Sequence, residues 1–395
     1  MVPLSDVVVL GAARTPLGGF QGGLASVAAP RLGAVAIAAA LERARVPATA
    51  VSDVFMGTVL QAGQGQAPAR QAAMYAGLPA SARTVTVHKV CGSGMQAVIH
   101  AAQVLQLDMA SVAVAGGMEN MSLAPYLLPG ARDGYRLGHQ RVVDSLVADG
   151  LWDPYNNQHM GSCAEQCAAR YGLTRERQDA YAVASFERAN AAQQGGLFAQ
   201  EIAAVDVPGP KGATRTVDQD EGPAKVRYDK IGSLRPAFDP AGTITAANAS
   251  TLNDGAAALV LSTAGHAAAL GVTPVARIVA YGGHAQDPVW FTTAPVEATR
   301  RALALAGWTA RDVDLWEVNE AFAVVPMAFM AEVGLSHDIV NVRGGAISLG
   351  HPIGCSGARI LVTLIAALRE HDLKRGVAAI CIGGGEGLAM CVELI

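Results

Sequence analysis

A pattern of strand-like, turn and helical segments occurs twice in this chain of 395 residues, and this repeat limits the folds available to it. Three pairs of segments match at offsets of 262, 263 and 267 positions: 44–51 with 306–313, 93–94 with 356–357, and 116–119 with 383–386. A nearly constant offset through different kinds of segment predicts two homologous halves. For any single pair, chance agreement of small residues in an alanine- and glycine-rich chain is the alternative.

Strand-like and helix-like runs alternate along the chain. The strand-like runs at 7–10, 54–60, 84–90 and 112–115 alternate with alanine-rich, helix-like runs at 32–45 and 95–105. This alternation predicts an α/β fold with largely buried strands.

The composition and periodicity of the sequence change between the two halves. Residues 120–248 are rich in turn residues and lack a clear period, which predicts an inserted loop-rich domain that carries substrate contacts. The alternative is a solvent-exposed insertion with a purely structural role. We therefore expect a first half at 1–119 plus 249–272, the insertion at 120–248, and a second half at 273–395.

Composition excludes several classes of function. Only 16% of the residues are charged and the net charge is -4, so no basic surface for nucleic acid is expected. No apolar run reaches the roughly 18 residues that cross a bilayer, and no targeting segment is visible. The six irregularly spaced cysteines favour reduced thiols. We expect a soluble cytoplasmic protein without membrane contact.

Cys91 lies between a β-branched run and a glycine-rich helix start. Free backbone N–H groups and the positive end of a helix dipole favour a thiolate at such a position, which predicts a nucleophile. A buried, inert thiol at a tight turn is the alternative. The local pattern leaves both interpretations open.

Three further segments place polar side chains at strand ends or glycine turns, where α/β proteins build their sites. They are 315–323 with Asn319, 341–359 with His351, and 378–387 with Cys381 and Gly383. Taken singly, Asn319 fits a helix cap, His351 a capped turn and Cys381 a packing residue.

Together the four segments resemble the thiolase family over the whole chain. The shared motifs are Cys-Gly-Ser-Gly at 91, Asn-Glu-Ala-Phe at 319, Gly-His-Pro at 350 and Cys-Ile-Gly-Gly-Gly at 381. The resemblance implies the thiolase fold, in which two homologous α/β halves form a layered α-β-α-β-α core with an inserted loop domain. It also implies acyl transfer between coenzyme A thioesters in two steps.

The resemblance assigns a role to each motif. Cys91 corresponds to the nucleophile that carries the acyl group, His351 to the base that activates it, and Cys381 to the residue that moves the α-proton of acetyl-CoA. One oxyanion hole uses His351 with a water held by Asn319. The other uses the backbone N–H groups of Cys91 and Gly383.

The resemblance also implies substrate contacts, with Arg227 as a candidate for the coenzyme A phosphates. Positions that match contacts to the pantetheine arm are Leu151, His159, Met160, Phe238, Ser250, Ala321 and Phe322.

The segments 158–160, 246–257 and 315–319 are similar to those of acetoacetyl-CoA thiolases. We therefore expect an acetyl-CoA C-acetyltransferase with acetyl-CoA, acetoacetyl-CoA and coenzyme A as ligands and no separate cofactor. The family suggests a homotetramer, a dimer of dimers. A 3-ketoacyl-CoA thiolase of broader chain length and a non-catalytic acyl-CoA- or lipid-binding relative are the alternatives.

Three positions depart from the family pattern. Pro223 stands where potassium-activated thiolases carry tyrosine, which argues against a potassium site. His88 and Arg343 stand where asparagine is usual, beside catalytic loops. Cys163 and Cys167 have the i, i+4 spacing of a metal pair, but the absence of nearby ligands in sequence favours core packing and no metal.

Overall fold

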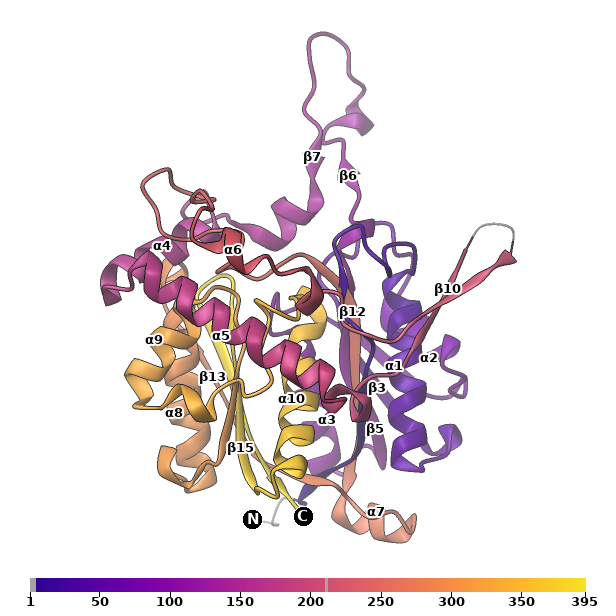
Figure 1. Ribbon diagram of the computed structural model, residues 1–395. Helices are drawn as coiled ribbons and strands as arrows, with labels where there is room; N and C mark the ends of the chain where they lie inside the picture. Colours follow the sequence, from indigo (N-terminus) through magenta and orange to yellow (C-terminus); the bar gives the residue numbers. More distant parts are fainter. Residues whose placement is uncertain (1–4, 210–211) are drawn as a thin grey trace.

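The computed structural model describes residues 5–209 and 212–395, and a ten-stranded sheet runs through its centre (Figure 1). The first half supplies β1 (Val7–Arg14), β2 (Gly18–Gly19), β3 (Asp53–Gly57), β4 (Arg83–Val87), β5 (Val112–Asn120) and β12 (Asn253–Thr263). The second half supplies β13 (Ala276–Ala285), β14 (Leu315–Val318), β15 (Arg375–Ile382) and β16 (Glu386–Leu394).

The strand order is the same in both halves. The first half reads β4-β3-β5-β12-β1, with β3 parallel to both β4 and β5. The second half reads β14-β15-β16-β13, with β14 parallel to β15 and bridged in parallel to Val340 on its other side. The two halves join where β1 pairs with β13. The predicted duplication is therefore visible in the topology.

One of the three sequence matches behind that prediction was wrong. Gly116 and Gly117 lie inside the buried strand β5, where they pair with β3. Gly383 and Gly384 lie in the turn between β15 and β16. Their agreement is a coincidence of small residues, whereas Ala44 and Ala306 both end a helix before a left-handed residue.

Helices cover the sheet in layers, as Figure 1 shows. The outer layers are α1 (Ala29–Ala44) with α2 (Pro68–Tyr75) and α8 (Ala294–Ala306) with α9 (Val324–Val333). Between the half-sheets lie α3 (Ser93–Gln106) and α10 (Ile353–Glu370). One buried cluster joins Ile99 of α3 and Leu361 of α10 to Phe55 on one half-sheet and Ile380 on the other. The expected α-β-α-β-α core is confirmed.

The central helices cross at a pair of glycines. A Cβ atom added to Gly94 would lie 2.7 Å from the backbone nitrogen of Ala358, and one added to Gly357 would lie 2.5 Å from that of Met95. Real Cβ atoms do not approach backbone this closely, so only glycine permits the crossing. Because α3 begins just after Cys91, this contact fixes the helix that carries the cysteine turn.

The segment between β5 and β12 forms hairpins and helices at one end of the sheet (Figure 1). Its main elements are β6 (Tyr126–Leu127), β7 (Val143–Asp144), β8 (Trp152–Asp153), β9 (Gln158–His159), α4 (Met160–Tyr171), α5 (Arg175–Gln194), β10 (Val205–Pro208), β11 (Thr214–Val217) and α6 (Tyr228–Ile231). The β6–β7 and β10–β11 hairpins project from the body. The domain boundaries given above stay a prediction.

A buried ionic cluster ties this inserted segment to both halves. Glu201 accepts from Arg14 Nε at 2.8 Å and from Arg343 Nη1 at 2.6 Å, and Arg14 Nη1 lies 2.8 Å from Asp220. Arg343 also pairs with Glu370 at the end of α10. This explains the departure at Arg343, which belongs to the core rather than to a catalytic loop. His88, by contrast, is exposed.

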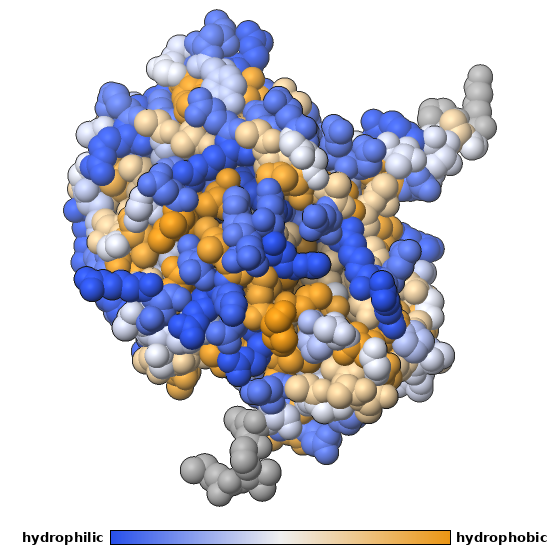
Figure 2. Space-filling model, turned by 60° about the horizontal axis from the view of Figure 1, so that its bottom comes forward, coloured by the Kyte–Doolittle hydropathy of each residue, from blue (hydrophilic) through white to orange (hydrophobic). Residues whose placement is uncertain are grey.

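On the face in Figure 2, hydrophobic residues form several patches among hydrophilic ones. Within residues 5–209 and 212–395, no helix combines the length and hydropathy needed to cross a membrane. All six cysteines lie in the described ranges and are free thiols. Cys163 and Cys167 are buried in a hydrophobic cluster, and the described residues contain no group of three metal-ligating side chains.

Candidate active site

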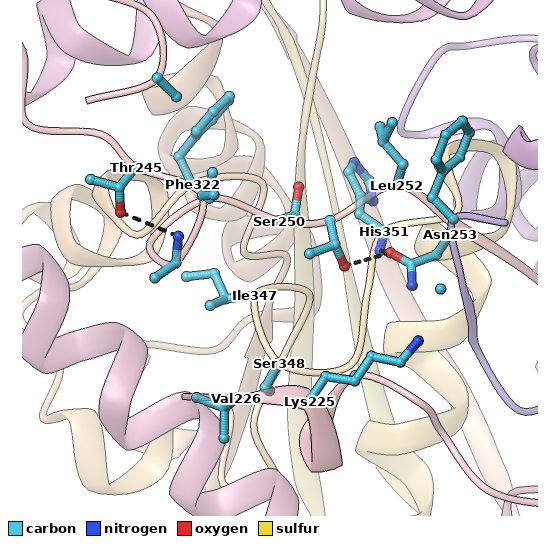
Figure 3. A pocket seen from close by; sticks show the side chains of 18 of the residues that line it. Lys225, Val226, Thr245, Ser250, Leu252, Asn253, Phe322, Ile347, Ser348 and His351 are labelled. Carbon is cyan, nitrogen blue, oxygen red and sulfur yellow. Dashed lines mark hydrogen bonds between the residues drawn. The ribbon is translucent and has the colours of Figure 1, made fainter. Parts of the chain in front are cut away.

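A pocket of about 810 Å³ opens between the inserted segment and the two halves (Figure 3). Its walls are mostly apolar with a few polar groups, as is usual for small-molecule sites. Seven of the predicted residues line it: Leu151, His159, Arg227, Phe238, Ser250, Phe322 and His351. The structure thus brings together residues that lie far apart in sequence.

Cys91 lies in a tight turn between β4 and α3. Val90 has a φ of 44°, a left-handed conformation that is rare for a β-branched residue. The Ser93 hydroxyl donates to the Val90 carbonyl at 2.7 Å and accepts from the Lys89 N–H at 2.8 Å. Of the six cysteines, only Cys91 is partly exposed. The turn therefore places Cys91 closer to the surface than the other five cysteines.

The electrostatics of Cys91 reverse the prediction made from the helix start. Burial raises the pKa of its thiol to about 11. The backbone N–H groups of Gly383 and of Cys91 itself lower the pKa and oppose this shift, but they do not overcome the loss of hydration. The expectation of a resting thiolate was wrong: at neutral pH the site holds a neutral thiol and needs a base.

His351 has the properties of that base. Burial, aided by the charge of Arg359, lowers its pKa to about 3, so the ring is neutral at pH 7. Its Nδ1 lies 2.6 Å from the Ser356 hydroxyl, which donates to the Pro352 carbonyl at 2.9 Å. A hydroxyl has one proton to give, so the imidazole proton belongs on Nδ1. Nε2 is then an unprotonated nitrogen without a partner among the described residues.

The backbone of His351 is also held in place. Its N–H donates to Asn253 Oδ1 at 3.0 Å, and Thr251 donates to the same oxygen at 2.7 Å. Figure 3 shows His351 and Asn253 next to each other at the pocket wall. The ring is therefore fixed by two separate hydrogen-bonded contacts.

The second half contributes Cys381 and the turn at Gly383. Cys381 is fully buried near the end of β15. Burial is the main cause that raises its pKa well above the usual range, and the nearby Cys91 is the second. A Cβ atom on Gly383 would lie 3.5 Å from Val90 and 3.6 Å from the Met160 side chain. The turn that follows Cys381 therefore packs directly against the turn that holds Cys91.

Asn319 lies at the end of β14 and is fully buried. Its backbone N–H donates to the Ala379 carbonyl at 2.9 Å, but neither side-chain amide atom has a partner in the described ranges. A buried amide without protein partners is costly unless it binds something else. Glu320, next in the chain, accepts from Tyr181 and Ser185 at 2.9 and 2.8 Å and so fixes this strand end.

An aromatic chain forms one wall of the pocket. The His159 ring stacks on Phe238 with centroids 4.7 Å apart, and Phe238 meets Phe322 edge-on at 5.9 Å. Burial lowers the pKa of His159, and its Nδ1 accepts from the Gly161 N–H at 3.0 Å. His159 is therefore a fixed, neutral side chain.

Two of the predicted contact residues do not line this pocket. Met160 and Ala321 instead join Cys381 in one buried hydrophobic cluster. They therefore belong to the cluster that contains the second thiol.

Basic side chains lie on the pocket lining. Arg227 has a side chain that is 71% exposed and lies 3.5 Å from Asp229. Sequence reasoning missed Lys225 and Lys230, which line the same pocket. The signal was present, because three cations occur within six residues there.

Two further site residues were not predicted. Ser356 directs the His351 ring, and its signal was its place in the helix start that follows Gly-His-Pro. Glu119 is fully buried and accepts from the N–H groups of Val59 and Gly354, both at 2.9 Å. Glu119 therefore ties the loop after β3 to the start of α10, next to Cys91.

Taken together, the site holds two thiols from opposite halves, one unprotonated imidazole nitrogen and aligned backbone donors. A neutral imidazole can accept a thiol proton and so create a nucleophile. Backbone N–H groups at the sulfur are placed to stabilise an oxyanion that forms on an acyl group there. The arrangement is suited to covalent acyl transfer.

Family models match nearly the whole chain. One described as "Thiolase, N-terminal domain" matches residues 7–265, and one described as "Thiolase, C-terminal domain" matches residues 272–394. The boundary between them falls just before β13, the first strand of the second half.

Similar proteins match over their full length. An acetyl-CoA acetyltransferase of Cupriavidus necator is 52% identical over 99% of this chain and 100% of its own. Acetyl-CoA acetyltransferase 2 of Arabidopsis thaliana is 53% identical over 99% of this chain and 97% of its own.

Solved structures are also similar over nearly the full length of this chain. The acetyl-CoA acetyltransferase of Bacillus anthracis superposes with a TM-score of 0.97 at 39% identity, covering 99% of both chains. A thiolase of Ascaris suum in complex with coenzyme A gives 0.93 at 42% identity, covering 99% of this chain and 100% of its own.

Proposed function

The chain belongs to the thiolase family, and we propose that it is an acetyl-CoA C-acetyltransferase that interconverts two acetyl-CoA molecules with acetoacetyl-CoA and coenzyme A. The observation that carries the proposal is that Cys91 and Cys381, from opposite halves, lie close enough for one thiol to affect the pKa of the other, while His351 contributes an imidazole nitrogen without a protein partner to the pocket wall. A protein that only binds acyl-CoA needs neither thiol nor base. The relatives named above support the same activity.

In the first step, His351 Nε2 takes the proton of the Cys91 thiol. The sulfur attacks the carbonyl carbon of acetyl-CoA, and the carbon–sulfur bond to coenzyme A breaks. The proton on His351 passes to the departing coenzyme A sulfur. Donation to the transient oxyanion contributes about 3 kcal/mol for one well-placed group.

In the second step, the Cys381 thiol passes its proton to His351 and, as a thiolate, removes the α-proton of a second acetyl-CoA. The resulting carbanion attacks the acetyl carbon on Cys91, and acetoacetyl-CoA leaves as the bond to the Cys91 sulfur breaks. The proton on His351 passes to that sulfur and the α-proton stays on Cys381, so both thiols are restored. Asn319, with its unpaired buried amide, supports the enolate oxygen together with His351.

The basic residues on the pocket lining suit the phosphates of coenzyme A. Lys225, Arg227 and Lys230 are all more than half exposed and are available to an anion arriving from solvent. The apolar wall of Phe238 and Phe322 suits the pantetheine arm. His159 narrows the end of the pocket that takes the acyl group, which favours a short acyl chain.

A thiolysis assay across acyl lengths tests the substrate range. We expect high activity with the four-carbon acetoacetyl-CoA and little with a ten-carbon 3-ketoacyl-CoA. Comparable rates with both would establish the broader 3-ketoacyl-CoA thiolase instead. No turnover with either would leave acyl-CoA binding without catalysis.

Mass spectrometry after incubation with acetyl-CoA tests the division of labour. Cys381→Ser should still be acetylated at Cys91 yet form no acetoacetyl-CoA, whereas Cys91→Ala should lose both. An unmodified Cys91 peptide in active wild-type enzyme would overturn the scheme.

We further propose a homotetramer, a dimer of dimers, in the cytoplasm. Tyr126, Leu128 and Leu137 on the projecting β6–β7 hairpin are 68%, 53% and 95% exposed, which suits contact with another copy (Figure 1). The free thiols suit a reducing compartment. Sedimentation of Leu137→Glu should show a smaller assembly than wild type.

We propose that the reaction needs no metal or separate cofactor. Pro223, in place of the tyrosine of potassium-activated thiolases, supports this. Replacing potassium with sodium in the assay should leave the rate unchanged.

A further inference from the structure

An ion pair joins the two turns that form the active site. Lys89, two residues before Cys91, pairs through Nζ with Glu386, which follows Gly383 by three residues. Lys89 belongs to the first half of the chain and Glu386 to the second. The side chains are 24% and 39% exposed, so the pair is partly shielded from water.

Both turns have backbone conformations that need support. Val90 has a φ of 44°, and Gly384 and Gly385 have φ values of 92° and 86°. A left-handed β-branched residue is strained, and such conformations persist only where surrounding contacts hold them. The Gly385 carbonyl accepts from the Gln286 N–H at 2.9 Å, which anchors the second turn to its own half.

Apart from this ion pair and the Gly383 N–H at the Cys91 sulfur, the turns meet through apolar contacts. Gly383 faces Val90, and a Cβ atom on Gly92 would lie 2.4 Å from Ile382 Cδ1. Apolar packing brings the turns together but is not directional. An ion pair has a defined geometry, and this one joins the turns at positions adjacent to the reacting sulfur and its Gly383 donor.

We propose that Lys89 and Glu386 are positioning residues for acyl transfer: their ion pair holds the Gly383 N–H at the Cys91 sulfur before substrate binds. The proposal rests on the proposed function, since it presumes that Cys91 carries the acyl group. The carbonyl oxygen of the acetyl group would then meet a donor that is already in place. Donors that are preorganised in this way lower the barrier.

The proposal separates catalysis from stability. A partly exposed ion pair contributes about 1 kcal/mol or less to folding. A donor moved by a fraction of an ångström, however, loses much of its effect in the transition state. Loss of the pair should therefore reduce turnover far more than it reduces the thermal midpoint.

The test compares kcat, KM and thermal midpoint for Lys89→Met, Glu386→Gln and the double variant. We expect each single variant to lower kcat about tenfold, which is less than the loss of a whole oxyanion donor. KM for acetyl-CoA and the thermal midpoint should change little. The double variant should be no worse than either single one, because both remove the same interaction.

Two further measurements exclude a merely structural role. The charge-reversed pair Lys89→Glu with Glu386→Lys should recover most of the lost kcat. At saturating acetyl-CoA, rising salt should lower the kcat of wild type but not that of Lys89→Met, because salt screens a partly exposed pair. Glu297→Gln is the matched control, since it removes an exposed ion pair with Arg300 away from the site.

Unchanged kcat in the single variants, additive losses in the double variant, or failure of the reversed pair would each overturn the proposal. The result is distinguishable from failure of the proposed function. If wild type forms acetyl-Cys91 and Lys89→Met forms it at the same rate, only the positioning role fails. If wild type forms none, the acyl-transfer function itself fails.

Discussion

The His351 Nδ1 atom lies 2.6 Å from the hydroxyl oxygen of Ser356 in the first turn of α10. Because that hydroxyl donates to the Pro352 carbonyl, Ser356 acts as an acceptor for the ring and keeps its proton on Nδ1. The opposite nitrogen is thereby left free to take a proton. One helix start thus both ends the loop and selects the tautomer of the base.

Ser356→Ala should slow the acetylation of Cys91 by roughly tenfold to a hundredfold, which is part of the roughly 10²–10⁴-fold that a positioned general base contributes. The reason is that the imidazole loses its directing partner and populates the other tautomer. Quenched-flow mass spectrometry of the Cys91 peptide measures the rate.

Ser262→Ala is the control for this change. Ser262 is also fully buried and donates to the Ser111 carbonyl at 2.6 Å, but it lies outside the pocket lining. It should lose similar stability without losing acetylation rate. Equal acetylation rates in the two variants would contradict the role assigned to Ser356.

The lowered pKa of His351 predicts a dependence of stability on pH. The unfolded ring takes up a proton as pH falls through about 6.5, whereas the folded ring does so only near 3. Its contribution to stability is therefore present above pH 6.5 and is lost as pH falls toward 3, by at most about 1.4 kcal/mol per pH unit.

His351→Asn removes this titration while keeping a polar group in place. Between pH 7.5 and 5.0, its thermal midpoint should fall less than that of wild type. Equal falls in scanning calorimetry would show that the folded ring has an ordinary pKa.

Gly94→Ala should destabilise the protein by about 1–3 kcal/mol or more, because the added methyl group meets backbone at the crossing of α3 and α10. Gly265→Ala is the matched change in α7 (Ala264–Ala269), where no atom lies within 4 Å of the new Cβ. It should be neutral or slightly stabilising. Thermal midpoints of the two variants provide the comparison, and similar midpoints would argue against close approach at the crossing.

Arg343→Asn restores the residue usual in the family but should destabilise this chain. Removing one partner of a buried ion pair typically costs about 3–5 kcal/mol, although Arg14 still neutralises part of the Glu201 charge. The rate per folded molecule should stay the same, because Arg343 lies in the core.

Arg300→Gln serves as the control for Arg343, since its ion pair with Glu297 is exposed and should contribute under about 1 kcal/mol. Denaturation and thiolysis assays on both variants test the prediction. A loss of rate in Arg343→Asn without loss of stability would place Arg343 in the site after all.

The order of motifs predicted the fold, and seven of the predicted site residues line one pocket, because strand ends and glycine turns in an α/β protein converge at one edge. The charge states of the site residues were harder to predict from the sequence. The helix start next to Cys91 suggested a thiolate, yet desolvation by residues distant in sequence outweighs it. Glu201 and Arg343 are 142 residues apart, so no local pattern could reveal their pairing.

The pairing of β1 with β13 has a mechanical consequence. Val7, Val8 and Val9 are in register with Ile278, Arg277 and Ala276, so main-chain hydrogen bonds run without a break from one half-sheet to the other. A hinge between the halves would have to tear this ladder and separate α3 from α10. The continuous sheet therefore restricts relative motion of the halves and with it any change in the spacing of the two sulfurs, one from each half.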